Sequence, residues 1–141
     1  MYRKKNSEAN EQTAFFEWAE YVNELKWMHS SLNGAFLAGD KVQRAIQMKK
    51  LKAQGMKNGV LDVFLPKAKG AYHGMYIEMK FGKNKMTDEQ KKFAIDIAAE
   101  GYCIFTCYNS GEAIDAVKLY LKLKPEETIS SACSFLSKNH T

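Results

Sequence analysis

The sequence has no apolar run long enough to cross a membrane and no signal-peptide hydrophobic segment near its start. Its three cysteines, Cys103, Cys107 and Cys133, lack the spacing of metal ligands, and the first two lie in an apolar run typical of reduced core residues. Neither a G-x-G-x-x-G motif nor a P-loop is present, so no fingerprint of an organic cofactor is found. These absences predict a cytoplasmic protein without an organic cofactor and argue against a small-molecule α/β domain.

Length and composition predict one soluble globular domain over residues 1–141. The chain has 45% hydrophobic and 26% charged residues, a balance typical of such domains. Its net charge is +5, and many of its lysines lie in segments 41–57 and 67–92. This excess suits a polyanionic partner, nucleic acid first, although surface lysines also serve solubility.

Two short apolar segments, 59–66 and 75–80, are predicted to be strands. The connector between them is rich in turn-forming residues. A hairpin folded about Gly70 would place Asp62 opposite Glu78. The sequence therefore predicts a pair of antiparallel strands that brings two carboxylates together.

Side chains alternate along a strand, so Glu78 and Lys80 are expected on one face with Asp62. Two close carboxylates are costly unless a cation lies between them or one carries a proton. Mg²⁺ or Mn²⁺, which prefer oxygen ligands, would supply that cation. The other interpretation is an ordinary set of charges on the solvent face of a sheet.

The first helix is predicted from Ser7 to about Trp27. Its apolar residues have helical spacing and are expected to face the core: Phe15, Trp18, Val22 and Leu25. Glu8 and Glu11 lie on that same face, one turn apart, which is unusual for carboxylates. They are either functional acids or first-turn acids favoured by the helix dipole.

The second helix is predicted over about 41–54, capped by Asp40 and ended by Gly55, after a loop at 29–34. Its expected inward residues are Val42, Ala45, Ile46 and Leu51. Its other face is basic, with Lys41, Arg44, Lys49, Lys50 and Lys52. Such a face is usually only solvated, but this one directly precedes the Asp62 strand.

Further along the chain, Thr87 and Gln90 form a capping box that starts a third helix, expected to end near Glu100. Its predicted inward residues are Phe93, Ala94, Ile97 and Ala98. A buried strand over 102–108 follows, and its position after a helix predicts a parallel neighbour. Another helix is expected from 110 or 111 to 121, and a short one over 129–136 in the tail.

In this order the elements resemble the VRR-NUC family, the virus-type replication-repair nucleases of the PD-(D/E)XK superfamily. The resemblance covers roughly residues 7–122, leaving 123–141 as a C-terminal tail. Its specific motifs are Glu8-x-x-x-Gln12 before Trp18, Asn33-Gly34, Gly55, Gly59-Val60-Leu61-Asp62, Ile77-Glu78-Met79-Lys80, Gln90 and Gly101-Tyr102. Leu61 departs from the family, which usually has proline there. The implied fold is an α/β, restriction-endonuclease-like core with a mixed central sheet flanked by helices.

The resemblance implies a catalytic set of Glu8, Asp62, Glu78, Lys80 and Gln90. Asp62 and Glu78 would hold Mg²⁺ or Mn²⁺, with the backbone carbonyl of Met79 as a further ligand. Glu8 would contribute directly or through water, since Gln12 matches the family's glutamine, although Glu11 fits the inward face equally well. Lys80 would position or help deprotonate the attacking water, and Gln90 would orient Lys80 or that water.

The implied substrate is DNA, cut at branches, nicks or flaps, with Holliday-junction resolution as one form of the activity. Stand-alone members are of phage or bacterial type, and a homodimer would place two sites on opposed strands of a junction. The expected DNA-binding residues are Asn33, Arg44, Lys49, Lys52, Lys57, Lys83 and Lys85. The alternative is a module that binds DNA without cutting it.

The apolar residues that lack a place in these elements are candidates for the dimer interface: Trp27 and Met28, and Ile129, Cys133 and Leu136 in the tail. They would otherwise fold back on the core of their own chain.

Overall fold

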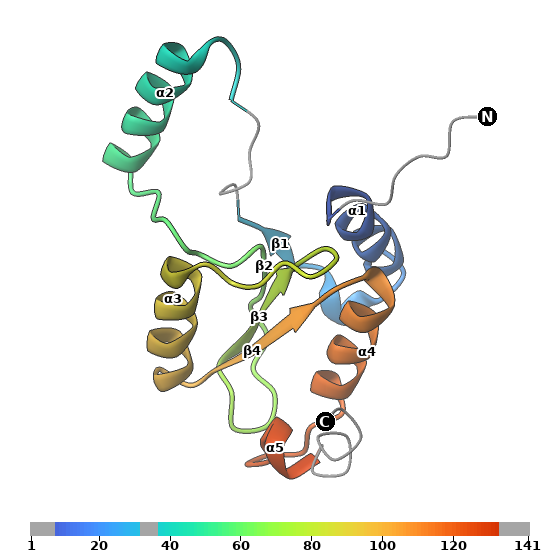
Figure 1. Ribbon diagram of the computed structural model, residues 1–141. Coiled ribbons are helices and arrows are strands. Elements are labelled where there is room, and N and C mark those ends of the chain that lie inside the picture. Colours follow the sequence, from blue (N-terminus) through green and yellow to red (C-terminus); the bar gives the residue numbers. More distant parts are fainter. Residues whose placement is uncertain (1–7, 32–36, 133–141) are drawn as a thin grey trace, which may run out of the picture.

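The computed structural model describes residues 8–31 and 37–132, which form a mixed four-stranded sheet with helices on both faces (Figure 1). The strands are β1 (His29–Ser30), β2 (Val63–Leu65), β3 (Gly74–Met79) and β4 (Tyr102–Cys107). The helices are α1 (Glu8–Ala19), the short 3₁₀ helix η1 (Asn23–Leu25), α2 (Lys41–Ala53), α3 (Asp88–Ala99), α4 (Ser110–Leu121) and α5 (Ile129–Ala132).

The strand order is β1-β2-β3-β4, with the first two pairs antiparallel and the last parallel. Val63 pairs with Ile77 and Leu65 with Met75, so the β2–β3 hairpin is centred on Gly70 as predicted. The α3 crossover connects β3 to β4, which confirms the predicted parallel pair. The α/β class and the mixed sheet follow the sequence prediction.

Helices α1 and α4 cover one face of the sheet and form the core with it (Figure 1). Alternate residues of β3, namely Met75, Ile77 and Met79, point into this core and are almost fully buried. Phe15 of α1 and Tyr120 of α4 are completely buried against them. The remaining side chains of β3 consequently face α3 on the other side of the sheet.

The prediction of one helix to about Trp27 is wrong, because α1 ends at Ala19. Val22 has an extended backbone, and η1 follows it. Leu25 and Met28 are buried in the core after this bend, and their burial stabilises the bent path over a straight helix. Met28 is therefore not available to a partner, whereas Trp27 is 72% exposed.

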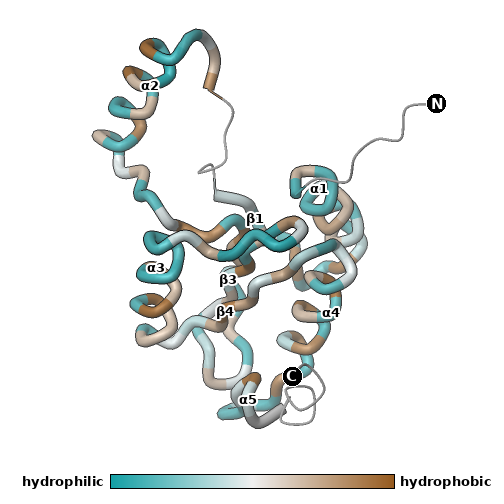
Figure 2. The backbone as a smooth tube through the Cα atoms, viewed as in Figure 1, coloured by the Kyte–Doolittle hydropathy of each residue, from teal (hydrophilic) through white to brown (hydrophobic). Residues whose placement is uncertain are grey.

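Helix α2 contradicts a second prediction, because its apolar face does not pack on the sheet. Val42 and Ile46 are 69% and 52% exposed, Ala45 is also exposed, and no residue of the helix is buried. Figure 1 shows α2 standing apart from the other elements, and Figure 2 shows apolar residues on its surface. The helical spacing of the apolar residues predicted the helix correctly, but it did not predict that these residues would be exposed.

Smaller differences concern strand lengths and the tail. The predicted strand 59–66 is regular only over Val63–Leu65, and the predicted loop 29–34 begins with the two residues of β1. Ala98 is exposed rather than inward. In the tail, Ile129 packs against the protein's own core, while Cys133 and Leu136 lie outside the described residues. No helix in the described part of the chain is long and apolar enough to span a membrane.

Candidate active site

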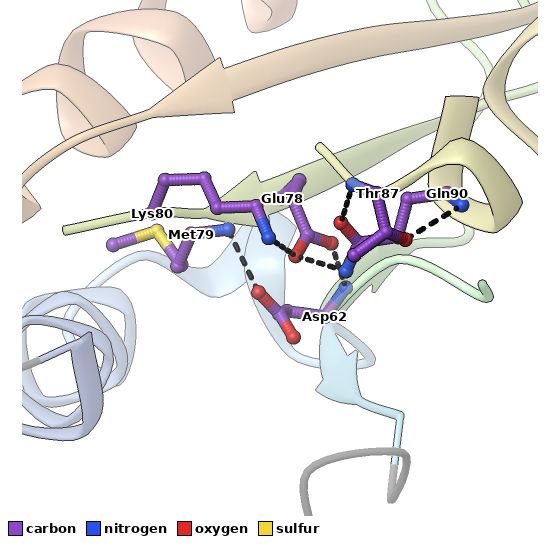
Figure 3. Close-up of polar contacts among 6 residues, drawn as sticks. All are labelled: Asp62, Glu78, Met79, Lys80, Thr87 and Gln90. Carbon is purple, nitrogen blue, oxygen red and sulfur yellow. Dashed lines mark hydrogen bonds and ion pairs between the residues drawn. The ribbon is translucent and has the colours of Figure 1, made fainter. Parts of the chain in front are cut away.

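Asp62 and Glu78 are held side by side by the β2–β3 register. The backbone N–H of Asp62 donates to Oε2 of Glu78 at 3.2 Å, and the N–H of Met79 donates to Oδ2 of Asp62 at 2.8 Å (Figure 3). Each carboxylate thus accepts a hydrogen bond from the strand segment that carries the other. The predicted convergence of the two acids is present in the structure.

Gln90 joins this pair from the first turn of α3. Its backbone N–H donates to Thr87 Oγ1 at 3.2 Å, and its Oε1 accepts from the N–H of Thr87 at 2.9 Å, which completes the predicted capping box. The Nε2 of Gln90 then donates to Oε1 of Glu78 at 2.9 Å (Figure 3). Capping of α3 therefore also fixes the amide that orients Glu78.

Lys80 completes the group at the end of β3. Its Nζ lies 3.5 Å from Oε1 of Glu78, and the two residues are 9% and 1% exposed. Burial and the neighbouring Asp62 carboxylate raise the pKa of Glu78 to about 8, against an opposing effect of Lys80. One ammonium is therefore not enough to keep both carboxylates charged near neutral pH.

A cavity of about 540 Å³ opens over these side chains. It is lined by Glu8, Ala9, Gln12, Met48, Met56, Asn58, Gly59, Val60, Asp62, Glu78, Lys80, Thr87, Glu89 and Gln90. The five residues of the predicted catalytic set therefore border one cavity, although they come from four separate segments of the chain.

The two acids of α1 have different surroundings. Glu8 lines the cavity, whereas Glu11 does not and accepts a hydrogen bond from the backbone N–H of Ser110 at 2.8 Å. Ser110 is the first residue of α4, so Glu11 satisfies an N–H at a helix start. The hydrogen bond to Ser110 explains why Glu11 points inward. Of the two acids, only Glu8 borders the cavity.

The donor set of this site fits a hard divalent cation, although the described residues contain no group of three or more His, Cys, Asp or Glu side chains that could hold a metal. Magnesium commonly takes one or two carboxylates and completes its coordination with water and substrate oxygens. The N–H of Met79 points to Asp62, and the N–H and C=O of a strand residue point to the same side. Asp62, Glu78 and the Met79 carbonyl are thus oxygens that could hold the ion, and the Glu8 carboxylate borders the same cavity.

The predicted DNA-binding residues are not gathered at one point. Arg44, Lys49 and Lys52 are exposed on α2, and Lys57 is exposed between α2 and the Asp62 segment. Lys83 and Lys85 are exposed in the loop before α3. Asn33 lies outside the described residues.

Two features near the site were not found in the sequence. Ser31 continues β1 opposite Asp62, and its N–H donates to the Asp62 carbonyl at 2.7 Å. Its hydroxyl is buried and has no hydrogen-bond partner among the described residues. Met48 and Met56 give the cavity an apolar side. Only the tertiary arrangement brings these residues to the carboxylates, since no local pattern connects them.

A family model described as the VRR-NUC domain matches residues 3–111. The chain belongs to the VRR-NUC family. Among solved structures, a VRR_NUC domain protein is similar, with 27% sequence identity and a TM-score of 0.72 over 87% of this chain and 94% of that one. Among curated proteins, none matches.

The VRR-NUC domain implies a nuclease-like function with DNA as the substrate. The family assignment confirms the resemblance found in the sequence, and the similar structure agrees with the α/β nuclease-like core.

Proposed function

We propose that this protein is a metal-dependent DNA endonuclease that hydrolyses phosphodiester bonds in the cavity beside β3. The observation that carries the proposal is the pairing of Asp62 with Glu78, each fixed by backbone donors, next to a buried Lys80. A protein that only binds DNA gains nothing from a carboxylate pair, one member of it buried, that repels the phosphate backbone. The same pair is what a phosphodiesterase needs to bind Mg²⁺ or Mn²⁺.

Asp62, Glu78 and the carbonyl of Met79 would hold the ion, with Glu8 acting directly or through water from across the cavity. When bound, the ion supplies Lewis-acid stabilisation of the phosphate and a more acidic water. The raised pKa of Glu78 supports this assignment, because an additional cation removes the cost of two adjacent negative charges.

Lys80 would act on the reacting groups, whereas Gln90 would act through Glu78. Lys80 Nζ lies 3.5 Å from Glu78. As an ammonium, Lys80 would orient the attacking water and stabilise charge on the phosphate, and it would take the proton of that water only as a neutral amine. The amide of Gln90 already donates to Glu78 and keeps that carboxylate in one orientation. Gln90 therefore acts as a positioning residue.

The preferred substrate in this proposal is branched DNA, with a four-way junction as one form and a flap or nick as another. The exposed basic residues of α2 and of the 83–85 loop would contact phosphates of the bound DNA, which gives affinity without base readout. A homodimer would supply two such sites for two opposed strands.

The test compares wild-type protein with Asp62→Ala, Glu78→Ala and Lys80→Ala on labelled junction, flap, nicked and linear DNA, with Mg²⁺ or with EDTA. The two acid variants should lose cleavage and keep binding, because lysines supply most phosphate contacts. Lys80→Ala should lower the turnover rate about 100-fold or more. Glu11→Ala, outside the cavity, is the matched control among acid variants and should still cut.

Cleavage by Asp62→Ala or Glu78→Ala at the wild-type rate would overturn the proposed site. DNA binding by the wild-type protein without cleavage under any of these conditions would support the alternative, a non-catalytic module.

A further inference from the structure

A row of aromatic side chains lies on the same face of the sheet as Glu78. Strand alternation places Phe64, Tyr76 and Tyr102 on this face, opposite the core. The ring centroids are 4.5 Å apart for Phe64 and Tyr76, 5.8 Å for Tyr76 and Tyr102, and 6.0 Å for Phe64 and Tyr102. These spacings correspond to direct ring contact.

Two exposed histidines extend this row at its ends. His29 lies edge-on to Phe64 at 5.7 Å, and His73 lies 5.9 Å from Tyr102. Beneath the rings, a Cβ on Gly74 would come within 3.0 Å of Phe64 and 3.3 Å of Tyr102. The absence of a side chain at Gly74 therefore allows these two rings to lie against the backbone.

The aromatic row (His29, Phe64, Tyr76, Tyr102 and His73) is only partly covered by helices of the described chain. Helix α3 packs over β4, and its Phe93 contacts Tyr76 edge-on at 5.2 Å. Helices α1 and α4 lie on the opposite face. Phe64, Tyr76 and Tyr102 are consequently half-buried instead of buried, and both histidines are exposed.

The position of the row indicates what would cover it. Tyr76 and Glu78 are two residues apart on one strand and point to the same face, which separates them by only about 7 Å. A DNA strand with its scissile phosphate at Glu78 therefore has its neighbouring nucleotides within reach of these rings. Aromatic rings bind any unpaired base by stacking, while the chain's excess of lysine attracts the phosphates.

We propose that the aromatic row is a stacking surface for unpaired bases next to the cut, so that the enzyme selects branched DNA through its single-stranded nucleotides. This inference rests on the proposed function and deepens it, because it names the feature of the branch that is bound. Duplex DNA, whose bases are already stacked, gains nothing from the row.

The experiment measures binding in EDTA, which prevents cleavage, by fluorescence anisotropy. Two labelled probes of equal length and charge are compared, one a single strand with normal bases and one with abasic sites at the central positions. The proteins are wild type, Phe64→Leu and His29→Ala. The matched control is Phe16→Leu, because Phe16 is also a half-buried phenylalanine but lies on α1, on the opposite side of the sheet.

Wild type and Phe16→Leu should bind the base-containing strand about tenfold more tightly than the abasic strand, the scale of one stacked base. Phe64→Leu should reduce this ratio at least about threefold. His29→Ala, at an exposed position, should reduce this ratio as well, and it tests the row independently if Phe64→Leu is unfolded.

Equal binding of the two probes by wild type, or the same ratio in all four proteins, would overturn the aromatic row as a base-binding surface. Sedimentation that shows a dimer broken by Phe64→Leu would overturn it too, because a second copy would then cover the row. If the protein cuts DNA with metal but binds both probes equally, the aromatic row is not a base-binding surface and the proposed function still stands. If it binds no DNA at all, the proposed function is wrong.

Discussion

At the scale of single residues, the raised pKa of Glu78 predicts how the stability of the protein depends on pH. Its pKa is raised from 4.5 to about 8, so the folded protein holds this proton more tightly than the unfolded chain does. The resulting stabilisation is complete below pH 4.5 and is lost as the pH rises through about 8. We expect the free energy of unfolding of the metal-free protein to fall across this range.

Denaturant titrations at several pH values in EDTA measure this dependence. Glu78→Gln, which cannot ionise, should show a much flatter profile than wild type. Added Mg²⁺ should restore most of the stability of wild type at pH 8, because the ion binds the deprotonated carboxylate. Parallel profiles for wild type and Glu78→Gln would show that another group is responsible.

Substitutions of the two acids of α1 should have different effects, one on cleavage and the other on stability. Glu8 borders the cavity and Glu11 accepts from the first N–H of α4. Glu8→Ala should lower metal-dependent cleavage with little effect on the melting temperature. Glu11→Ala should cost about 1 kcal/mol of stability, the scale of a lost helix-terminal acceptor, and should cut at nearly the wild-type rate. The reverse pattern would move the catalytic role to Glu11.

At the scale of elements, the capping box of α3 connects helix stability to the site. Thr87→Ala should cost about 1 kcal/mol, because the backbone N–H of Gln90 loses Thr87 Oγ1 as its acceptor. The variant should also lower the turnover rate, because a loosened first turn of α3 holds the Gln90 amide less firmly against Glu78.

Asp40→Ala provides the comparison for Thr87→Ala, since Asp40 and Gln43 form the same kind of box at the start of α2, away from Glu78. It should lose a similar helix stabilisation and keep its turnover rate on saturating DNA. If both variants lost turnover equally, the effect would be general loosening instead of the position of Gln90.

Helix α2 is an element whose charge can be changed at little cost to the fold, because none of its residues is buried. Arg44→Gln, Lys49→Gln and Lys52→Gln should each weaken DNA binding. If these residues contact phosphates, each should reduce the slope of log affinity against log salt concentration by about 0.9. The measurement is a salt titration of DNA binding in EDTA. Lys118→Gln, on α4, is the matched control and should leave the slope unchanged.

At the scale of the whole molecule, the exposed apolar side chains favour a homodimer. Trp27, Val42 and Ile46 are 72%, 69% and 52% exposed, on two separate parts of the chain. We expect the protein to sediment at twice its 16.0 kDa mass at micromolar concentration without DNA. The interface should bury at least about 1,000 Å² and be apolar at its centre.

Ile46→Asp and Trp27→Asp should identify the surface, since only the variant within the interface should become monomeric. That variant should still nick DNA but no longer make paired cuts on one junction. A wild-type monomer that makes both cuts concertedly would contradict the dimer.

The amino-acid sequence determined the features that depend on neighbouring residues. The capping box of α3, the Asp40 cap of α2, the hairpin about Gly70 and the pairing of Asp62 with Glu78 follow from cap residues, turn residues and the two-residue period of a strand. A hairpin register depends on one local turn, so the site carboxylates could be placed before any tertiary structure was known.

The tertiary structure alone decided which surfaces those elements meet. An apolar stripe has the same sequence period whether it is buried or exposed, so Val42 and Ile46 were expected inside and are outside. Glu8 and Glu11 share one face of α1, and only the packing of α4 beside that helix gives Glu11 a backbone partner. Contacts between residues 99 positions apart, as from Ser110 to Glu11, depend on the whole fold and on no local preference.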